Sequence, residues 1–386
     1  MKIVEYDVVK YKAVLHSVTP IYIGSHETER PIVNFAIVKR NNQPKVVAIK
    51  EQKVLEYLNR YYKNEKAFKE KLSGFLSLKD VEVLAKDVRY FLHLPSNDVR
   101  NLRNNARSIR PIIRDPYSRP YIPGSSLKGA IRTALLYHFM KQNPSMVERL
   151  NREIEQYIDT MKKKKKRIPR DLSRKMQIDR RNLIDFIEGS FLRSELNAKG
   201  KASKQHTDIL RTLRITDSKL LPRDACTLYE VKVYRTVKTQ LPPKLEPKGF
   251  SIFLEAIPPN TKIEFEITID RWLLKKFKKT FDLEDILLES LREFSAKIIE
   301  EDKWIKLPNL HKPSSQDVNI RIGFGSGLIA TSLFSLLDSN LRKIIRDIMK
   351  GHFDDEYIPS SRKVVLLNDH PKWLLGWGKL ELERVV

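Results

Sequence analysis

The chain has 386 residues, 41% of which are apolar, and it carries a formal net charge of +25. This length and composition predict a globular protein with room for two domains, and they exclude wholesale disorder. No stretch approaches the ~20 apolar residues of a membrane helix, so we expect a soluble, cytoplasmic protein. The single cysteine, Cys226, excludes an internal disulfide framework and a cysteine-based zinc site.

The excess of positive charge indicates the class of partner. Lysine and arginine together number 73, against 48 for aspartate and glutamate, and the isoelectric point is about 9.8. A compact body with this surplus repels itself, and a polyanion relieves the repulsion by accepting phosphate contacts and releasing counterions. A basic protein of the membrane surface is the competing class, but neither an amphipathic basic helix nor a lipidation signal is evident. The charge therefore favours a nucleic acid.

The first part of the chain reads as strands followed by a helix. Apolar residues alternate or run together at 8–18, 32–38 and 46–49, which predicts strands. Helical spacing then predicts a helix at 51–73. At 97–119 arginines recur among Asn, Pro and Ser, which indicates an extended basic segment or a loosely helical lobe.

The sharpest local signal is the segment 121–136, YIPGSSLKGAIRTALL. Its Pro-Gly pair stops the incoming segment, and Ser125 or Ser126 can cap the helix that follows. Lys128 and Arg132 are four residues apart and share the face opposite the apolar stripe. The exposed amides of such a helix start, with two cations beside them, suit a phosphate. An ordinary capped helix with two solvated basic residues fits the same spacing equally well.

The rest of the chain continues this alternation of elements. Residues 141–206 are strongly charged and contain the basic run 162–167, which predicts a helical insertion with a solvated loop. The patterns that follow predict four strands, at 213–221, 229–234, 250–256 and 262–269, and then a helix at 282–300. A glycine-rich loop at 323–327 precedes an apolar helix at 328–337, and the chain returns to strand at 373–382.

Each half of the chain thus contains strands, a helix and a glycine-rich segment near a helix start. This order predicts an α+β fold of two ferredoxin-like domains with glycine-rich loops and a charged helical insertion. We place the boundary between residues 190 and 215, which gives domains at 1–200 and 201–386.

Two further glycine bends could let a phosphate approach the main chain. The loop GFGSG at 323–327 lies just after Arg321, and it lacks the spacing of a dinucleotide fingerprint and the Gly-Lys-Ser/Thr of a P-loop. The second bend, at 21–26 with the sequence IYIGSH, follows the first predicted strand. For the glycine-rich loop, a purely structural turn is the alternative.

Catalytic candidates are few. His16 or His26 could act as a general base in metal-independent RNA cleavage, although a structural or phosphate-contacting histidine is the more common case. Asp217 could be an acid, but a turn or capping role is favoured. No His, Asp and Glu cluster has the spacing of metal ligands, so we expect no metal and no cofactor.

Taken together, five landmarks resemble the RAMP superfamily of CRISPR proteins. They are TPIYIGSHE, IPGSSLKGAIRT, LRITDS, RIGFGSG and a tail that contains Trp373 and Trp377. In this order they look most like the fifth Csm subunit of type III-A effector complexes. The landmarks extend over nearly the whole chain, from 19 to 380. His26 departs from the family pattern, because many relatives carry glycine at that position.

The resemblance implies RRM-like ferredoxin folds that bind CRISPR RNA within a ribonucleoprotein. It implies a subunit at the head of the complex, near the guide 3′ end, in contact with the backbone RAMP subunit and the small helical subunit. It also implies a part in guide 3′-end maturation through recruited host nucleases. No catalytic residue is carried over. The RNA-contacting residues that it implies are Gly24, Ser25, His26, Gly124, Ser125, Ser126, Lys128, Arg132, Arg321, Gly323, Gly325 and Gly327.

Three functions therefore compete. The first is a non-catalytic RNA-binding subunit of a type III-A complex, which predicts salt-sensitive RNA affinity and no cleavage by the purified chain. The second is a metal-independent CRISPR RNA processing endoribonuclease of the same superfamily, which would use His16 or His26. The third is a basic RNA-binding protein without any connection to CRISPR.

Overall fold

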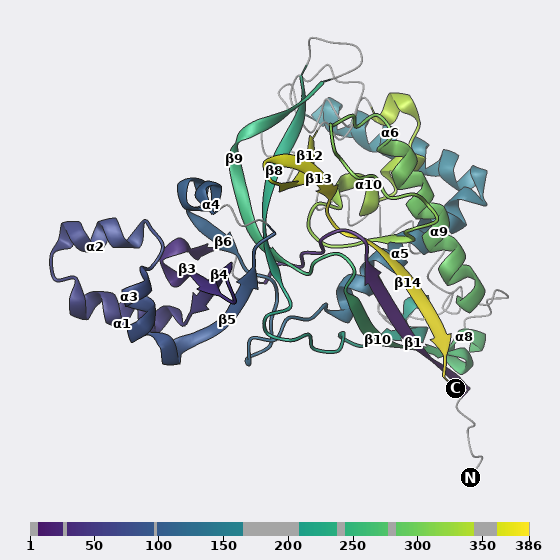
Figure 1. The fold of residues 1–386 in the computed structure, drawn as a ribbon. Helices are drawn as coiled ribbons and strands as arrows, with labels where there is room; N and C mark the ends of the chain where they lie inside the picture. The colour runs from purple at the N-terminus through teal and green to yellow at the C-terminus, as the bar shows by residue number, and fades with distance from the viewer. Residues whose placement is uncertain are drawn as a thin grey trace.

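The computed structural model describes residues 7–25, 29–95, 99–164, 208–237, 244–276, 283–342 and 361–385. These residues form a mixed α+β fold built on two curled sheets (Figure 1). Among the described helices, none is long and apolar enough to cross a membrane.

The first sheet is antiparallel throughout, in the order β11-β14-β1-β10-β7. Its strands are β1 (Val8–Ser17), β7 (Leu213–Ile215), β10 (Lys262–Asp270), β11 (Ile320–Arg321) and β14 (Trp377–Arg384). In β1 every second residue from Val9 onward is buried, which is the period-two pattern of a strand with one covered face. The strand predicted at 8–18 is confirmed.

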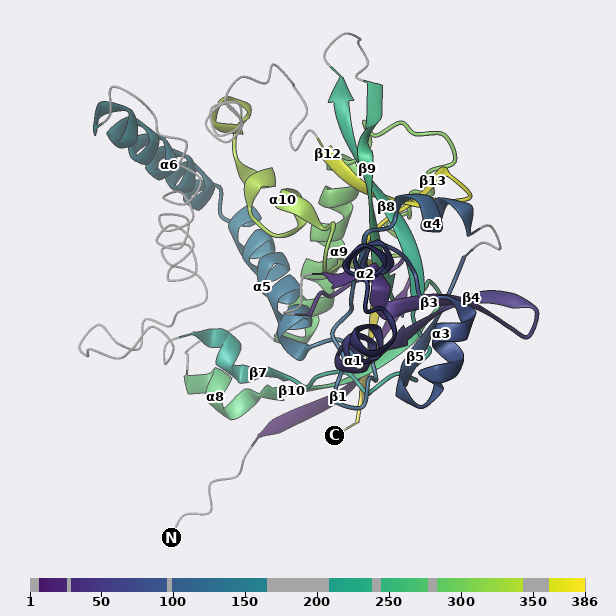
Figure 2. The same ribbon diagram turned by 90° about the vertical axis from the view of Figure 1, so that its left-hand side faces the viewer.

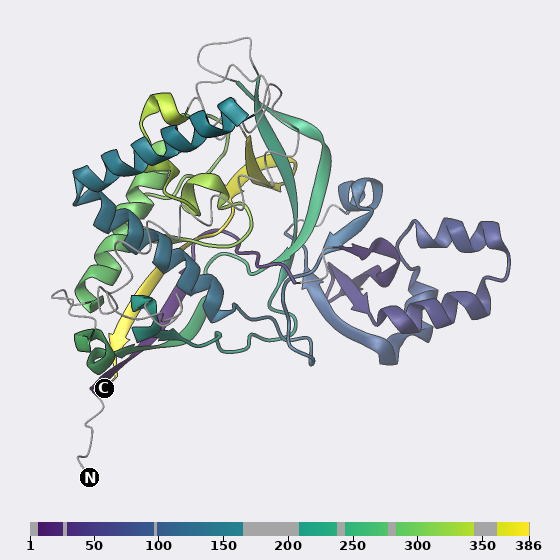
Figure 3. The ribbon, with the colours of Figure 1, turned by 180° about the vertical axis from the view of Figure 1, so that it is seen from behind.

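Two helices share the core of this sheet, α5 (Gly124–Lys141) and α9 (Leu283–Glu301). They pack against each other (Figure 3). The rings of Tyr137 and Phe294 lie 5.0 Å apart at this contact. Between them, the buried ring of His138 contacts the carboxylate of Glu293 at 2.8 Å. Both helices confirm predictions made from their apolar spacing.

The second sheet runs in the order β2-β6-β9-β8-β5-β4-β3, and β12 joins it by pairing with β8 and β13. Figure 2 shows the long β8–β9 hairpin extending away from the first sheet. The strands are β2 (Arg30–Pro31), β3 (Phe35–Arg40), β4 (Gln43–Ile49), β5 (Val88–His93), β6 (Ser108–Arg110), β8 (Thr227–Val237), β9 (Lys244–Ala256), β12 (Ser361–Leu367) and β13 (His370–Leu374).

A small helical lobe projects from the edge of the second sheet (Figure 1). Its helices α1 (Glu51–Tyr61), α2 (Glu65–Leu72) and α3 (Leu78–Val83) bury residues such as Val54 and Leu58 in a core separate from the main one. The single helix predicted at 51–73 is wrong, because the Asn64 side chain accepts amide hydrogen bonds and starts a second helix there.

The remaining described helices are short, apart from α6. They are α4 (Arg100–Asn105), α6 (Pro144–Lys164), α8 (Arg271–Lys276), α10 (Gly327–Ala330) and the 3₁₀ turns η1 (Ile32–Asn34), η2 (Ala85–Asp87), η5 (Ile209–Thr212) and η6 (Phe334–Leu336). The apolar run 328–337 therefore forms two short pieces instead of the predicted helix. The first part of the insertion predicted at 141–206 is helical in α6, and 165–206 lie outside the described residues.

Both sheets combine strands from the two halves of the chain. β1 lies between β10 and β14, and β8 and β9 pair with β5 and β6. The predicted boundary near residue 200 therefore does not separate one sheet from the other. Residue periodicity identifies a strand but not its partner, and the pairings of β1 with β10 and β14 join segments more than two hundred residues apart.

Candidate nucleic-acid interface

The glycine-rich loop at 323–327 has the backbone that only glycine adopts easily. Gly323, Gly325 and Gly327 have φ angles of +78°, +92° and +72°. A Cβ atom at Gly323 would lie 2.4 Å from the carbonyl oxygen of Tyr22. The amide of Phe324 donates a hydrogen bond to that same oxygen at 2.9 Å. The loop therefore packs directly against the other predicted glycine bend, which follows β1.

A third segment completes this meeting point. Gly24 bridges Ile112, and the amide of Ile113 donates to the carbonyl of Ile23 at 2.9 Å. The amide of Ser25 donates to the carbonyl of Pro111 at 3.4 Å. Three stretches that are far apart in the sequence thus lie side by side, and Gly24, Gly323 and Gly327 are exposed there.

Two cations gather on the ring of Phe324 in this loop. The Lys363 ammonium lies 3.9 Å from the ring centroid and the Arg110 guanidinium carbon 5.5 Å from it. Arg110 also forms an ion pair with Glu29 at 3.0 Å. Lys363 is half-buried, and within the described part of the chain it has no hydrogen-bond or ion-pair partner. A bound anion would compensate the charge of Lys363, whereas Arg110 already has Glu29 as its counter-charge.

The pKa of Lys363 reflects this environment. Burial lowers the pKa of the Lys363 ammonium, and the positive charge of Arg110 lowers it further. Both effects make the protonated form costly in the unliganded protein. A phosphate oxygen placed between the two side chains would reverse that cost, so the pair favours binding of an anion.

Arg321 stands beside the loop but faces inward. Its guanidinium donates to the carbonyls of Gly325 at 3.1 Å and Leu375 at 3.2 Å. It also pairs with the carboxylate of Asp302 at 3.0 Å, and its side chain is only 2% exposed. An RNA-contacting Arg321 would need a solvent-facing side chain, so this prediction is corrected. Arg321 instead stabilises the loop from the protein interior, through its hydrogen bond to the Gly325 carbonyl.

Asp302 connects Arg321, which holds the glycine-rich loop, to the strand that carries Lys363. Its second carboxylate oxygen accepts a hydrogen bond from Arg362 at 2.6 Å, and Arg362 precedes Lys363 in β12. A buried carboxylate between two buried arginines satisfies donors that would otherwise be stranded in the core. Asp302 therefore fixes both the glycine-rich loop and the strand that carries Lys363.

The bend at Gly124 is built differently, because the protein supplies its own anion. The amide of Gly124 donates to the Asp217 carboxylate at 2.8 Å, which confirms the capping role favoured for Asp217. A Cβ atom at Gly124 would lie 2.4 Å and 2.5 Å from the carbonyl oxygens of Thr216 and Ile215. The predicted open phosphate site at this helix start is thus closed by β7 and the residues after it.

The predicted serine cap is also absent. Pro123 is the N-cap residue and makes no side-chain cap, so Ser125 and Ser126 lie within the first turn of α5. The amide of Ser126 donates to the carbonyl of Pro123 at 2.9 Å. The helix begins at Gly124, one residue before the first of these serines, and Pro123 at the cap position has no hydroxyl group that could accept an amide hydrogen bond.

The two cations of α5 share a face, as predicted, but they bond within the protein. The Lys128 ammonium donates to the carbonyl of Leu213 at 2.7 Å, and burial lowers its pKa. Arg132 forms an ion pair with Asp208 at 2.7 Å. Both side chains therefore fasten α5 to η5 and β7.

The uncovered face of the first sheet carries paired charges. Lys12 and Lys219 approach Glu264 at 3.6 Å and 2.6 Å, and His16 lies 3.3 Å from Glu381. The outward-facing residues of the described strands β1, β10 and β14 include no Phe, Tyr or Trp, and their one aromatic ring, the imidazole of His16, lies beside Glu381. This face therefore offers no row of aromatic rings on which successive bases could stack.

Of the remaining predicted residues, His26 lies outside the described residues. Within the described ranges, no group of three His, Cys, Asp or Glu side chains is arranged to hold a metal ion. The sequence analysis missed Arg110 as a site residue and did not single out Lys363 at all. The only available signal was the arginine-rich texture around 110, because nothing local in the sequence relates either residue to the loop.

Comparisons with known proteins agree with the sequence pattern. The model of the RAMP superfamily matches residues 14–328. The CRISPR system Cms protein Csm5 of Streptococcus thermophilus is 27% identical over 254 residues, which cover 65% of this chain and 57% of that protein. The Csm5 protein of Mycobacterium tuberculosis H37Rv is 23% identical over 173 residues, which cover 42% of this chain and 36% of that one. The match therefore spans little more than half of these relatives at most.

Two solved structures share the fold. A chain in the cryo-EM structure of a Csm–crRNA–target RNA ternary complex of a type III-A system has a TM-score of 0.64 at 21% identity. That match covers 96% of this chain and 100% of the other. The crystal structure of T. onnurineus Csm5 has a TM-score of 0.56 at 21% identity, with 95% and 99% covered.

Proposed function

Because the chain belongs to the RAMP superfamily, we propose that it is a non-catalytic, CRISPR RNA-binding subunit of a type III-A Csm complex. One observation carries the RNA-binding part of this proposal. The two exposed glycine bends at 22–25 and 323–327 lie side by side, and the cations Arg110 and Lys363 converge on the same loop. The names of the relatives and the formal charge of +25 support it.

The fold has the order of elements that such a subunit needs. β1, α5, β7, β10, α9 and β14 occur in this order along the chain, as βαββαβ with other elements inserted between them, and their strands lie in the order β14-β1-β10-β7. This is the arrangement of a ferredoxin-like unit, and we assign it to one RRM-like domain built from both ends of the chain. The second predicted RRM-like domain would lie within the second sheet.

The contacts that we propose are to the RNA backbone. The exposed glycines Gly24, Gly323 and Gly327 let a phosphate come close to the main chain, and Lys363 and Arg110 supply the charge. Such contacts carry little base selectivity and weaken steeply with salt. Gly24, Ser25, Gly323, Gly325 and Gly327 stay in this proposal.

The partners follow from the same assignment. We include the backbone RAMP subunit and the small helical subunit, a position at the guide 3′ end, and a part in 3′-end maturation with host nucleases. Co-purification of the tagged chain, followed by identification of bound proteins and RNA, tests each of these partners directly.

The central test compares two double variants. Arg110→Gln with Lys363→Gln removes both loop cations, and Lys12→Gln with Lys219→Gln removes the same charge from the paired open face. The first should weaken guide RNA binding about tenfold and reduce the salt slope by about two, because two phosphate contacts are lost. The second should change affinity much less. Equal RNA affinity for both variants, with unchanged melting temperatures, would refute the proposed site.

The endoribonuclease alternative rests on the histidine next to a carboxylate, His16 beside Glu381 at 3.3 Å. Incubation of the purified chain with repeat RNA and no metal decides between the two functions. A discrete product that is lost in His16→Ala or His26→Ala would replace our proposal with that enzyme.

A further inference from the structure

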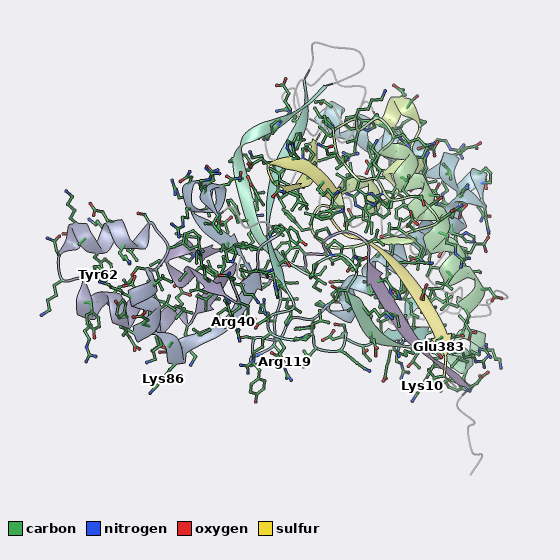
Figure 4. All side chains as sticks on the ribbon, in the orientation of Figure 1. Lys10, Arg40, Tyr62, Lys86, Arg119 and Glu383 are labelled. Atoms are coloured by element: carbon green, nitrogen blue, oxygen red, sulfur yellow. The ribbon has the colours of Figure 1, made fainter. Side chains whose placement is uncertain are left out.

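The outer edge of β14 is only partly covered. One side of β14 pairs with β1 from Gly378 to Arg384. On the other side β11 pairs with Trp377 and Gly378 alone. Figure 4 shows Lys10 and Glu383 near the far end of this sheet, where β14 runs beyond β11. An uncovered strand edge is a template for another strand.

The hydrogen bonds around Asn319 show which main-chain groups face this edge. The Asn319 side chain donates to the Leu380 carbonyl at 2.8 Å and accepts from the Leu380 amide at 2.7 Å. It thus replaces one peptide of a neighbouring strand. On the opposite side, the amide of Val385 donates to Lys10 of β1. Since the pattern alternates, the main-chain groups of Leu382 and Arg384 point outward with Leu380.

A groove runs along this edge, between β14 and α9. Its volume is about 610 Å³, and its apolar lining includes Leu288, Val318 and Leu382. Arg292 lies at its rim, is exposed, and has no partner within the described part of the chain. The other rim cation, Lys379, has Glu381 3.5 Å away. One uncompensated positive charge therefore remains beside an apolar floor and open main-chain groups.

We propose that this groove binds an extended segment of a partner protein, which adds a short strand to β14 and places an acidic side chain against Arg292. Strand addition follows from the outward donors and acceptors of Leu382 and Arg384, because they alternate as a paired strand requires. Alternate side chains of the guest would lie on one face, so an apolar residue over Leu288 and an acidic one at Arg292 would stand two positions apart. Asn319 marks the end of the added strand.

RNA fits this groove less well than a protein strand does. The walls contribute one uncompensated cation, and the floor is aliphatic with no aromatic ring. A nucleic acid would need several phosphate contacts and stacking surfaces. The proposal concerns a surface separate from the glycine-rich loop and does not depend on the proposed RNA site.

A charge exchange tests the proposal. The probe is the acetylated peptide Thr-Val-Thr-Glu-Thr-Val, and its reference carries Lys in place of Glu. At millimolar concentration, the Glu peptide should slow hydrogen exchange at the Leu382 and Arg384 amides of the full chain, whereas the Lys peptide should bind at least tenfold more weakly. Arg292→Glu should reverse this preference.

Three outcomes would overturn the proposal. They are no slowing at these two amides, slowing that ignores the charge of the peptide, and slowing by guide RNA that requires Arg292. Arg292→Glu should keep the melting temperature and the guide RNA affinity of the parent, because its side chain is exposed and has no partner within the described part of the chain, the loop cations included. Loss of RNA affinity in Arg110→Gln with Lys363→Gln, together with intact peptide binding, would separate the two sites.

Discussion

The bends at Gly124 and at 323–327 look alike in sequence, since each combines glycine and serine with a nearby cation, yet they have opposite electrostatic designs. At Gly124 the amide is capped by Asp217, and Lys128 and Arg132 are bonded within the protein. At the second bend the supporting charge, Asp302, is buried below the loop, and Lys363 faces the loop without an anion.

The position of the carboxylate distinguishes a glycine bend that has only a structural role from one that can bind an anion. Glycine and lysine in a short segment allow an anion to approach, but they do not tell whether the chain supplies that anion itself. The decisive residue is a carboxylate brought in from elsewhere. When the carboxylate reaches the bend, as Asp217 does, the site is closed. When it lies behind the bend, as Asp302 does, Lys363 is left without an anion, although Arg110 pairs with Glu29.

The largest effect should come from the two carboxylates. Asp302→Asn leaves Arg321 and Arg362 buried without their counter-charge, so unfolding free energy should fall by about 3–5 kcal/mol. Asp217→Asn keeps an oxygen that accepts from the Gly124 amide and removes only the negative charge at the helix start, so it should cost only about 0.3–1 kcal/mol. Urea denaturation measures both. If Asp302→Asn is no more destabilising than Asp217→Asn, Asp302 is not the support that we describe.

The same two variants should also differ in RNA binding. Asp302→Asn loosens the loop and should weaken binding of guide RNA in folded protein, whereas Asp217→Asn should leave it unchanged. Binding measured well below the denaturation midpoint separates this effect from unfolding.

The next effect concerns the space at the closed bend. Gly124→Ala would place a Cβ atom 2.4 Å from the carbonyl oxygen of Thr216, and neither backbone can yield easily. We expect a loss of about 1–3 kcal/mol, as for other overpacked positions. Gly129→Ala in the same helix is the control, because nothing lies within 4 Å there. That change should stabilise the helix by up to about 1 kcal/mol. Equal stabilities would contradict the close packing of α5 on β7.

The sequence predicted the parts of the fold that depend on local pattern. The strand at β1 and the helices α5 and α9 have clear periodicity. A turn or capping role for Asp217 follows from its residue type, but the helix start that it caps lies 93 residues away, and the sequence did not indicate it. The pairing of strands could not be predicted, because a period-two pattern shows which face of a strand is buried but not which strand lies beside it. Nothing in the sequence therefore indicated that strands of the two predicted halves pair in both sheets.

The candidate site was predictable only in part, for the same reason. The glycines of 323–327 are marked by composition, and their positive φ angles agree with it. Lys363 lies in an ordinary alternating strand, and its contact with Phe324 depends on β12 joining the second sheet. Arg321 was predicted to contact RNA and is buried instead. It lies beside the glycine-rich loop in sequence, but it pairs with Asp302 in the interior, and no local pattern relates these two residues.

A smaller effect should distinguish the lysines of the two bends. Lys128→Gln removes a hydrogen bond to the Leu213 carbonyl and should lower stability by about 1 kcal/mol, with little change in RNA affinity. Lys363→Gln should do the reverse, because its charge has no internal partner among the described residues and its burial is costly. Thermal melting and RNA titration on both variants give the comparison. RNA binding that depends on Lys128 as strongly as on Lys363 would remove the distinction between the bends.

The smallest effect is a pH dependence of RNA binding at the open bend. The pKa of Lys363 is lowered in the free protein, first by burial and then by Arg110, and a bound phosphate would raise it. The complex then holds more protons than its free components as pH rises through the lowered pKa, so affinity should fall in that window, by no more than about tenfold per pH unit for one proton. Lys363→Arg keeps its charge throughout and should lose this dependence, while titration of the RNA bases affects both proteins equally. Identical pH profiles for the parent and Lys363→Arg would mean that Lys363 does not meet the phosphate.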